Sequence, residues 1–245
     1  MNGQKTQGGT TGALQKRTFG HETGHRLLWL GSGAAEIACG RTIYTLTREW
    51  GLWLPAGTAP AQLNHEGVQC RELCLQSGSA ALSADITVVR VTPLLRLLLS
   101  RLDDPAVTDE SRSLTTAMIA DLLESAEDAL VVEVPAASVL EPIVTALLAE
   151  PGHTLTLDQW ARELQVSTKT ITRAFQRETG LGFTGWRSAV RARAAVEWLA
   201  AGMDPADVAS RSGYHSASAF GAAFRRVTGR TPGDFRPCPV MSPVD

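Results

Sequence analysis

The C-terminal part of the chain contains one residue pattern twice, with the two copies 49 positions apart. Each copy holds a phenylalanine, an arginine, a threonine, a glycine and an aromatic residue followed by arginine. These are Phe175, Arg177, Thr179, Gly180, Trp186 and Arg187 in the first copy, and Phe224, Arg226, Thr228, Gly229, Phe235 and Arg236 in the second. Self-similarity at a fixed period indicates a repeated structural unit. The fold is therefore restricted to one that forms the same short helical unit twice.

The first copy predicts two helices joined by a turn. Residues 156–159 have the Thr-x-x-Gln form of a capping box, so one helix should begin at Leu157 and Ser167 should cap the next. Polar residues then occupy the outer face of a helix at about 167–178, where they can reach base edges or phosphates in a major groove. These candidate DNA contacts are Ser167, Thr168, Lys169, Thr172, Arg173 and Gln176.

The second copy predicts the same arrangement with different surface chemistry. Asp204 should cap its first helix, Gly213 should allow the turn, and Ser216 should cap a helix at about 216–227. The candidate DNA contacts of this copy are Ser216, Ala217, Ser218, Gly221, Ala222 and Arg225. Most of these side chains lack groups that read bases, so we expect phosphate contacts and shape fit here.

A single helix from Phe183 to Ala201 should join the two copies. At about 1.5 Å per residue it would be about 28 Å long, close to the roughly 34 Å between successive major grooves on one face of B-DNA. A rigid spacer of this length would place the two recognition helices in adjacent grooves. We expect its arginines, Arg187, Arg191 and Arg193, either to touch backbone or to bind internal carboxylates.

Charge is distributed unevenly along this chain of net charge −2. Residues 1–150 hold 11 Lys and Arg against 17 Asp and Glu, whereas residues 151–245 hold 12 against 8. The repeat thus lies in the basic part. A positive excess favours attraction to phosphate, although a solvated surface would also account for it.

Short apolar runs separated by Gly, Pro and Thr predict antiparallel strands in the N-terminal part. The runs are residues 26–30, 35–39, 42–46, 51–54, 70–75 and 86–91. Strands of this length and spacing are typical of a small sandwich or barrel.

Two helices with apolar stripes should follow, at residues 94–102 and 111–127. They either cover the sheet or pair with a second copy of the chain, and we favour the homodimer. Residues 131–134 should be extended, and a helix should span residues 138–148.

The pattern of the basic part extends well beyond the repeat. It comprises Ala161, Ser167, Phe175, Arg177, Thr179, Gly180, Arg191, Ala195, Leu199, Val208, Ala209, Gly213, Tyr214, Ser218, Ala219, Phe220, Phe224, Arg225, Arg226, Gly229, Thr231, Pro232, Phe235 and Arg236. This pattern resembles the AraC/XylS family of bacterial transcription regulators over roughly residues 139–236. The resemblance implies two helix-turn-helix motifs. The base-reading positions that it implies are Lys169, Thr172 and Arg173 in the first motif, and Ala217, Ser218, Gly221 and Ala222 in the second.

The N-terminal part resembles, less specifically, the cupin-type sensor domain of such regulators. We therefore expect an α+β multidomain protein. Its small β-barrel or cupin-like domain with helices should precede an all-α domain with two helix-turn-helix motifs joined by a long helix. The expected divisions are a flexible tail at 1–12, a β domain at 13–91, a helical linker or dimerisation segment at 92–134, the DNA-binding domain at 135–236 and a tail at 237–245.

The alternative function is a cupin-fold metal enzyme with an accessory helical binding module. Its candidate metal ligands are His21, Glu22, His25 and His65. By the resemblance, residues 59–60 stand where related domains have a further histidine, so this ligand set is incomplete. Because no acid–base pair accompanies it, we expect a transcription regulator without catalytic residues, metal or cofactor.

The expected partner is double-stranded promoter or operator DNA, with RNA polymerase as a second partner if the protein activates rather than represses. A small-molecule effector could bind among Trp29, Tyr44, Trp50 and Trp53, although aromatic residues on strands are more often core. The sequence has no run of eighteen apolar residues and no apolar signal core at its start. These features favour a cytoplasmic protein that does not enter a membrane.

Overall fold

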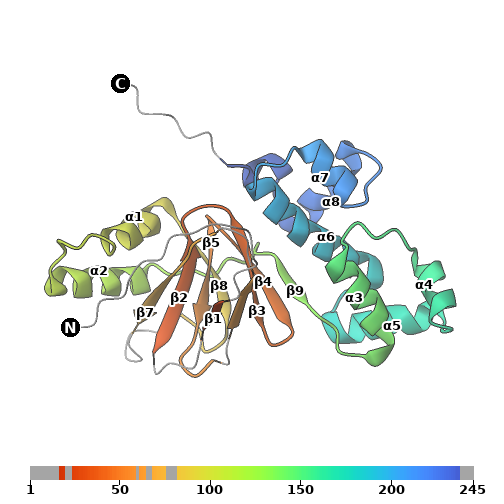
Figure 1. The fold of residues 1–245 in the computed structure, drawn as a ribbon. Coiled ribbons are helices and arrows are strands. Elements are labelled where there is room, and N and C mark those ends of the chain that lie inside the picture. Colours follow the sequence, from red (N-terminus) through yellow and green to blue (C-terminus); the bar gives the residue numbers. More distant parts are fainter. Residues whose placement is uncertain (1–16, 20–23, 59–60, 65–67, 76–81, 238–245) are drawn as a thin grey trace.

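The structure is a computed structural model that describes residues 17–19, 24–58, 61–64, 68–75 and 82–237. β-Sheets built from the N-terminal residues lie beside a C-terminal group of helices (Figure 1). The protein thus has the expected α+β architecture. The expected tail at 1–12, residues 238–245 of the other tail, and the candidate ligands His21, Glu22 and His65 lie outside the described residues.

The described strands form two antiparallel sheets. The strands are β1 (Arg17–Phe19), β2 (His25–Leu30), β3 (Ala34–Cys39), β4 (Thr42–Thr47), β5 (Trp50–Leu54), β6 (Ala61–Asn64), β7 (Cys70–Leu75), β8 (Thr87–Arg90) and β9 (Val131–Glu133). One sheet has the order β1-β6-β3-β4-β9, and the other has the order β7-β2-β5-β8.

The expected barrel is not closed, because the described strands belong to two separate sheets. Strand β4 pairs on both edges, with β3 and β9, and strand β5 pairs on both edges, with β2 and β8. Neither strand has a free edge, so β4 and β5 do not pair with each other although they are adjacent in sequence. Leu28 and Leu30 of one sheet share a core with Ile37 and Leu46 of the other, as the sandwich alternative requires.

Two helices, α1 (Pro93–Arg101) and α2 (Asp109–Asp121), cover the other face of the four-stranded sheet. Side chains alternate along β2, so Leu27 and Trp29 face away from the core between the sheets. They pack instead in a second cluster with Leu95 of α1 and Ile119 of α2.

Helix α2 ends at Asp121, earlier than the expected end at residue 127. Beyond α2 the chain returns to the sheet. There the backbone N–H of Arg90 donates to the carbonyl of Glu124 at 3.0 Å, and that of Ala126 donates to the carbonyl of Val88 at 2.8 Å. Pairing with β8 therefore replaces the last helical turns.

The helical domain follows β9. Its elements are η1 (Ser138–Leu140), α3 (Glu141–Ala149), α4 (Leu157–Glu163), α5 (Thr168–Thr179), α6 (Phe183–Ala200), α7 (Pro205–Arg211), α8 (Ala217–Thr228) and η2 (Pro232–Phe235). The expected long helix is α6, which ends one residue early. None of the described helices combines the length and apolarity needed to cross a membrane.

Helix α6 contributes to two cores. Near its N-terminus, Phe183 and Trp186 pack on Phe175 of α5, with ring centroids 5.8 and 5.1 Å from that ring. Near its C-terminus, Leu199 lies in the cluster that contains Phe224 of α8 and the inner residues of the sheets. The first helix pair (α4 and α5) thus has a largely helical core, whereas the second helix pair (α7 and α8) shares its core with the β domain.

Candidate nucleic-acid interface

Each helix of the two pairs begins at the side-chain cap that the sequence predicts. The caps are Thr156, Ser167, Asp204 and Ser216, each of which accepts a hydrogen bond from a backbone N–H two or three residues later. Thr156 also forms the full capping box, because its own N–H donates to Gln159 Oε1 at 2.7 Å. These bonds satisfy backbone donors that a helix start leaves without partners.

The turns inside the two pairs have the same geometry. Gln165 has φ 54° and Gly213 has φ 72°, both in the left-handed region. In each turn the next backbone N–H donates to an alanine carbonyl of the preceding helix at 3.0 Å, from Val166 to Ala161 and from Tyr214 to Ala209. Gln165 thus adopts in the first copy the left-handed conformation for which the second copy uses glycine.

The ends of α5 and α8 explain why the repeated residues recur. Thr179 Oγ1 donates to the carbonyl of Phe175 at 2.9 Å, and Thr228 Oγ1 donates to that of Phe224 at 2.9 Å. Gly180 and the equivalent glycine of the second copy then end their helices in the left-handed conformation. These recurring residues form a structural framework, because they set the helix ends and leave the outer faces free to differ.

The candidate DNA contacts lie on the solvent-facing sides of α5 and α8. Ser167, Lys169, Thr172, Arg173, Gln176, Ser216, Ala217, Ser218, Ala222 and Arg225 are exposed, and Thr168 and Gly221 are partly exposed. On the opposite sides of the same helices, Ile171, Ala174, Phe175, Phe220, Ala223 and Phe224 are buried. The structure therefore presents both sets of residues to a partner.

Three exposed side chains of α5 have hydrogen-bond donors without a partner among the described residues. Within the described residues, the side chains of Lys169, Thr172 and Arg173 form no hydrogen bond or ion pair, so their donors are available to a partner. By contrast, Ser167 Oγ already accepts the N–H of Thr170 at 3.0 Å, and Gln176 Nε2 donates to the carbonyl of Gly180 at 2.7 Å. These two side chains therefore stabilise the start and the end of α5.

The outer face of α8 is small and carries its charge near the C-terminus. Alanines, a serine and a glycine occupy the first turns, while Arg225 and Arg226 lie in the last turn. Neither α5 nor α8 has an acidic residue in its first turn. The positive ends of both helix dipoles are therefore not neutralised and can face phosphate.

The arginines of α6 are structural. Arg187 donates to the carbonyl of Leu155 at 3.2 Å. Arg191 is buried and donates to the carbonyls of Pro151 at 3.0 Å and His153 at 3.1 Å. Both side chains therefore brace the loop before α4.

Arg193 of α6 binds an internal carboxylate, as expected, and this carboxylate belongs to the β domain. It forms an ion pair with Glu36 of β3, in which the side chains retain only 8% and 11% of their exposure. Burial raises the pKa of the Glu36 carboxyl above its usual value, and the charge of Arg193 opposes that rise. This buried pair joins α6 directly to β3.

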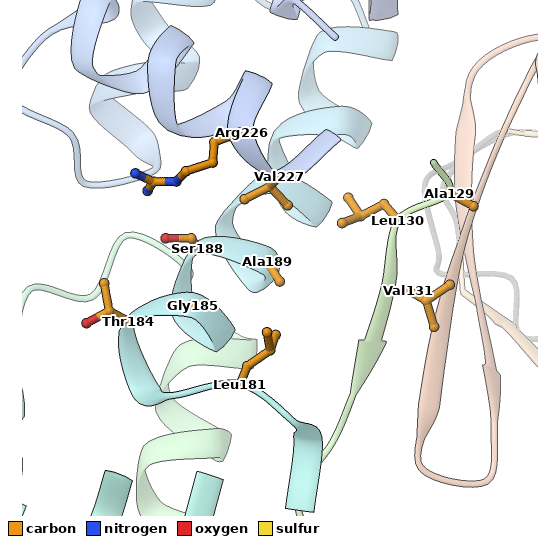
Figure 2. Close-up of a pocket in the computed structure, with 10 residues that line it drawn as sticks. All are labelled: Ala129, Leu130, Val131, Leu181, Thr184, Gly185, Ser188, Ala189, Arg226 and Val227. Carbon is orange, nitrogen blue, oxygen red and sulfur yellow. The ribbon is translucent and has the colours of Figure 1, made fainter. Parts of the chain in front are cut away.

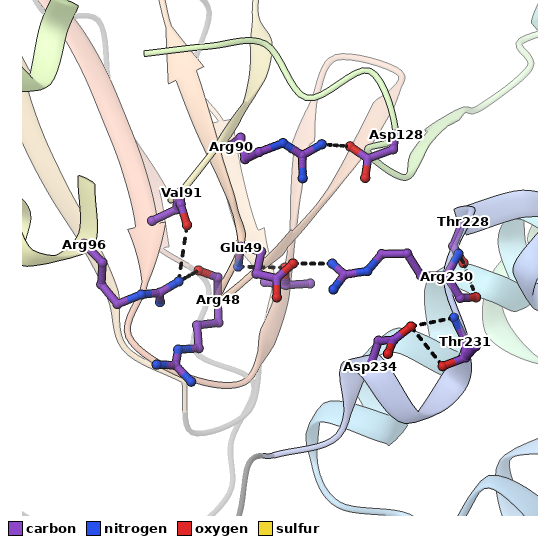
Figure 3. A network of polar contacts seen from close by, with 11 residues as sticks. Arg48, Glu49, Arg90, Val91, Arg96, Asp128, Thr228, Arg230, Thr231 and Asp234 are labelled. Atoms are coloured by element: carbon purple, nitrogen blue, oxygen red, sulfur yellow. Dashed lines mark hydrogen bonds and ion pairs between the residues drawn. The ribbon is translucent and has the colours of Figure 1, made fainter. Parts of the chain in front are cut away.

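A second ion pair joins the halves of the protein beyond α8. Figure 3 shows Arg230 reaching Glu49, in the loop between β4 and β5. Nearby, the ring of Phe235 packs on Trp50 of β5 with centroids 5.6 Å apart. Sequence patterns do not predict these contacts, because the partners are far apart along the chain.

Residues that we considered for an effector site or a metal site have structural roles. Trp50 and Trp53 are fully buried, and Trp29 is nearly so. The ring of His25 stacks on Trp53 at 4.9 Å, and its Nδ1 accepts the N–H of Ala56 at 3.1 Å. In the part of the chain that the structure describes, no three His, Cys, Asp or Glu side chains are grouped to hold a metal.

The chain is similar to several known proteins. Residues 160–237 match a family described as a helix-turn-helix domain. The chain is 23% identical over 229 residues to the HTH-type transcriptional regulator NimR of Escherichia coli, covering 92% of this chain and 84% of NimR. It is 31% identical over 195 residues to a putative AraC-like transcription regulator of Streptomyces antibioticus, covering 76% of this chain and 56% of that protein.

Other relatives match over a shorter part of the chain, and the chain spans only part of their length. The regulator RipA of Corynebacterium glutamicum is 34% identical over 101 residues, which is 30% of RipA. Among solved structures, ToxT from Vibrio cholerae has a TM-score of 0.38 at 11% identity, covering 92% of this chain and 94% of ToxT. The C-terminal domain of AraT from Geobacillus stearothermophilus has a TM-score of 0.40 at 21% identity, covering 44% of this chain and 94% of that domain.

Proposed function

Because this chain carries an AraC-type helix-turn-helix domain and is a DNA-binding transcription regulator, we propose that it binds DNA through two such units. The first helix pair is one unit and the second helix pair is the other. In this proposal α5 and α8 enter adjacent major grooves on one face of the duplex. The observation that carries it is the repetition of one backbone framework on a single helix, α6.

The length of α6 supports the proposed spacing. Its 18 residues span about 27 Å at about 1.5 Å per residue, near the roughly 34 Å between successive grooves. Helix α5 packs near the start of α6, while α8 packs near its end. The two outer faces are therefore held apart by a rigid element rather than by a loop.

The two units would divide the work of binding. Lys169, Thr172 and Arg173 of α5 can donate to base edges, and an arginine can pair with guanine through two hydrogen bonds. The first turns of α8 offer mainly small side chains, so this helix can approach the DNA backbone closely. Arg225, in the last turn, can then contact a phosphate. We propose that α5 supplies sequence preference and that α8 supplies position and affinity.

Sequencing the fragments of its own genome that the purified protein retains would test this function. We expect enrichment of a two-part site in which one part is more restricted in sequence than the other. Retention of fragments without a shared sequence would contradict specific regulation. A shared site with equal restriction in both parts would contradict only the division between α5 and α8.

We also propose that the protein forms a homodimer through α1 and α2. These helices bury Leu95 and Ile119 against the sheet and still expose large apolar side chains on the other side. The exposed residues are Leu94 at 52%, Leu97 at 69%, Leu114 at 67% and Met118 at 52%. Grouped exposed apolar residues are typical of an interaction surface, and a second copy of the chain offers the same apolar surface in return.

Sedimentation of the protein carrying Leu97→Glu would test the dimer. A charge at this exposed position should disrupt the interface while leaving the fold intact, so the variant should sediment as a monomer. A wild-type protein that is monomeric at micromolar concentration would contradict the proposal, as would a variant that remains dimeric.

We further propose residues 135–236 as the DNA-binding domain and the two-sheet region as an open variant of the cupin-type sensor domain. β9 supports placing the boundary just after it, because this strand pairs with β4 while its buried Val132 packs in the core of the first helix pair. As a regulator of transcription, the protein would work in the cytoplasm, where its DNA lies.

A further inference from the structure

A pocket of about 580 Å³ lies where the β domain meets the helical domain. Figure 2 shows its walls, which come from three separate parts of the chain: the segment that leads into β9, the start of α6 and the end of α8. Its lining residues are Ala129, Leu130, Val131, Leu181, Thr184, Gly185, Ser188, Ala189, Arg226 and Val227. Pockets that bind small molecules usually fall within about 300–1,000 Å³.

Most of the lining is apolar and partly uncovered. Val131 remains 38% exposed and Leu181 42% exposed, although both are large apolar side chains. Leu130, Ala189 and Val227 extend the same apolar surface. A molecule with an apolar body would cover these side chains and remove them from water.

The polar residues of the pocket lie on one side of it. In Figure 2, Arg226, Ser188 and Thr184 lie along one side, and Leu130 and Val131 lie along the opposite side. Arg226 is exposed, and no ion pair with a carboxylate is found for it among the described residues. A guanidinium binds carboxylate, sulfonate or phosphate oxygens through paired hydrogen bonds.

We propose that this pocket binds a small amphipathic organic anion. Its apolar body would lie on Leu130, Val131 and Leu181, and its anionic group would bind Arg226 with Ser188 nearby. Such a ligand would contact the β domain, α6 and α8 together. Arg226 directly follows Arg225, which is the proposed phosphate contact. The ligand would therefore bind next to the proposed DNA-binding surface but outside it.

Two fluorescent probes of matched shape would test the binding site without DNA. The first, 1-anilinonaphthalene-8-sulfonate, is an amphipathic anion, and the second, N-phenyl-1-naphthylamine, has the same rings without the sulfonate. Arg226→Gln should weaken binding of the anion about 10-fold, as loss of a charge-assisted contact does, and should change binding of the neutral probe less than about twofold. Arg236→Gln, which removes an exposed arginine outside the pocket, is the matched control and should change neither.

A second variant, Gly185→Leu, would fill the pocket while keeping the helix. A Cβ at Gly185 would meet only Leu181, at 3.6 and 3.8 Å, and leucine favours a helix more than glycine does. This variant should weaken binding of both probes about 10-fold or more. If Gly185→Leu binds both probes as the wild type does, or if the wild-type protein binds neither probe, the pocket is not a binding site.

If Arg226→Gln weakens both probes equally, Arg226 does not recognise the anionic group. Because neither measurement involves DNA, their failure would leave the proposed DNA binding standing.

Discussion

The two helix pairs share one framework and differ in what surrounds it. Both begin at side-chain caps, turn through a residue with positive φ and end at a left-handed glycine. The first pair exposes long polar donors and packs mainly against other helices. The second pair exposes small residues, and its core continues into the β domain.

The same backbone framework thus carries different exposed residues and different packing in the two pairs. The framework residues fix the helix ends, so the outer faces and the inner contacts can change independently. Ion pairs from Arg193 and Arg230 to Glu36 and Glu49 link the region around the second pair to the sheets. An ion pair between Arg41 and Glu178 of α5 also links the first pair to the β domain. We propose that the first pair reads bases and that the second pair, whose core continues into the sheets, positions the protein on DNA.

Removing the buried ion pair between α6 and β3 should have the largest effect. Glu36→Ala leaves the charge of Arg193 buried without a partner, which should lower the free energy of unfolding by about 3–5 kcal/mol. Urea denaturation followed by tryptophan fluorescence would measure it. The double variant Glu36→Leu with Arg193→Met removes both charges together and should remain within about 1–2 kcal/mol of wild type.

Hydrogen exchange in Glu36→Ala would then compare the two pairs directly. Amides of α8 should exchange faster, while those of α5 should keep more of their protection, because the core of the first pair lies elsewhere. An equal loss of protection in α5 and α8 would contradict the claim that the sheets support the second pair more than the first.

Arg173→Ala should have the next largest effect, and it concerns DNA rather than stability. If Arg173 reads a base, the variant loses about 1–3 kcal/mol at its preferred site and relaxes the preference there. Electrophoretic shifts with the preferred site and single-base variants would measure both changes. Arg162→Ala, which removes an exposed arginine of α4, is the control and should keep the preference. A uniform loss at all sequences would reassign Arg173 to a phosphate.

The equivalent turns should respond in opposite directions to exchange of their residues. Gly213→Ala should destabilise the protein by about 1–2 kcal/mol, because an L residue is strained at φ 72°. A Cβ there would also lie 2.5 Å from the carbonyl oxygen of Gly152. Gln165→Gly should instead be neutral or stabilise by about 0.5 kcal/mol, because glycine relieves the same strain. Thermal unfolding of both variants measures the difference, and loss of stability in both would mean that the turns are not equivalent.

Arg225→Ala should have the smallest effect on DNA binding. Loss of one phosphate contact should weaken binding by a similar factor at every sequence and reduce the slope of log affinity against log salt by about 1. Titrations at several salt concentrations, with the preferred site and with unrelated DNA, would measure this. If Arg173→Ala and Arg225→Ala behave alike at every sequence and salt concentration, the proposed division of labour is wrong.

Local signals in the sequence predicted most of the helical domain. Caps such as Thr156 and Ser167 and the recurring glycines act on residues within one turn, so a short window of sequence is enough to find them. The positions of buried and exposed residues on α5 and α8 follow from the same helical spacing.

Features that depend on distant partners were not predictable in this way. Helix α2 ends early because residues 124–126 pair with β8, far back in the chain. The barrel remains open because both edges of β4 and β5 are taken, which depends on the register of the whole sheet. The partner of Arg193 on β3 is likewise set by how the two halves pack.

Hydroxyl-radical footprinting on the preferred genomic site would test the central claim most directly. Two units held by α6 should protect two segments on one face of the duplex, with centres about 10 base pairs apart. Arg173→Ala should weaken protection in one of these segments more than in the other. A single protected segment, or two segments on opposite faces, would contradict the account.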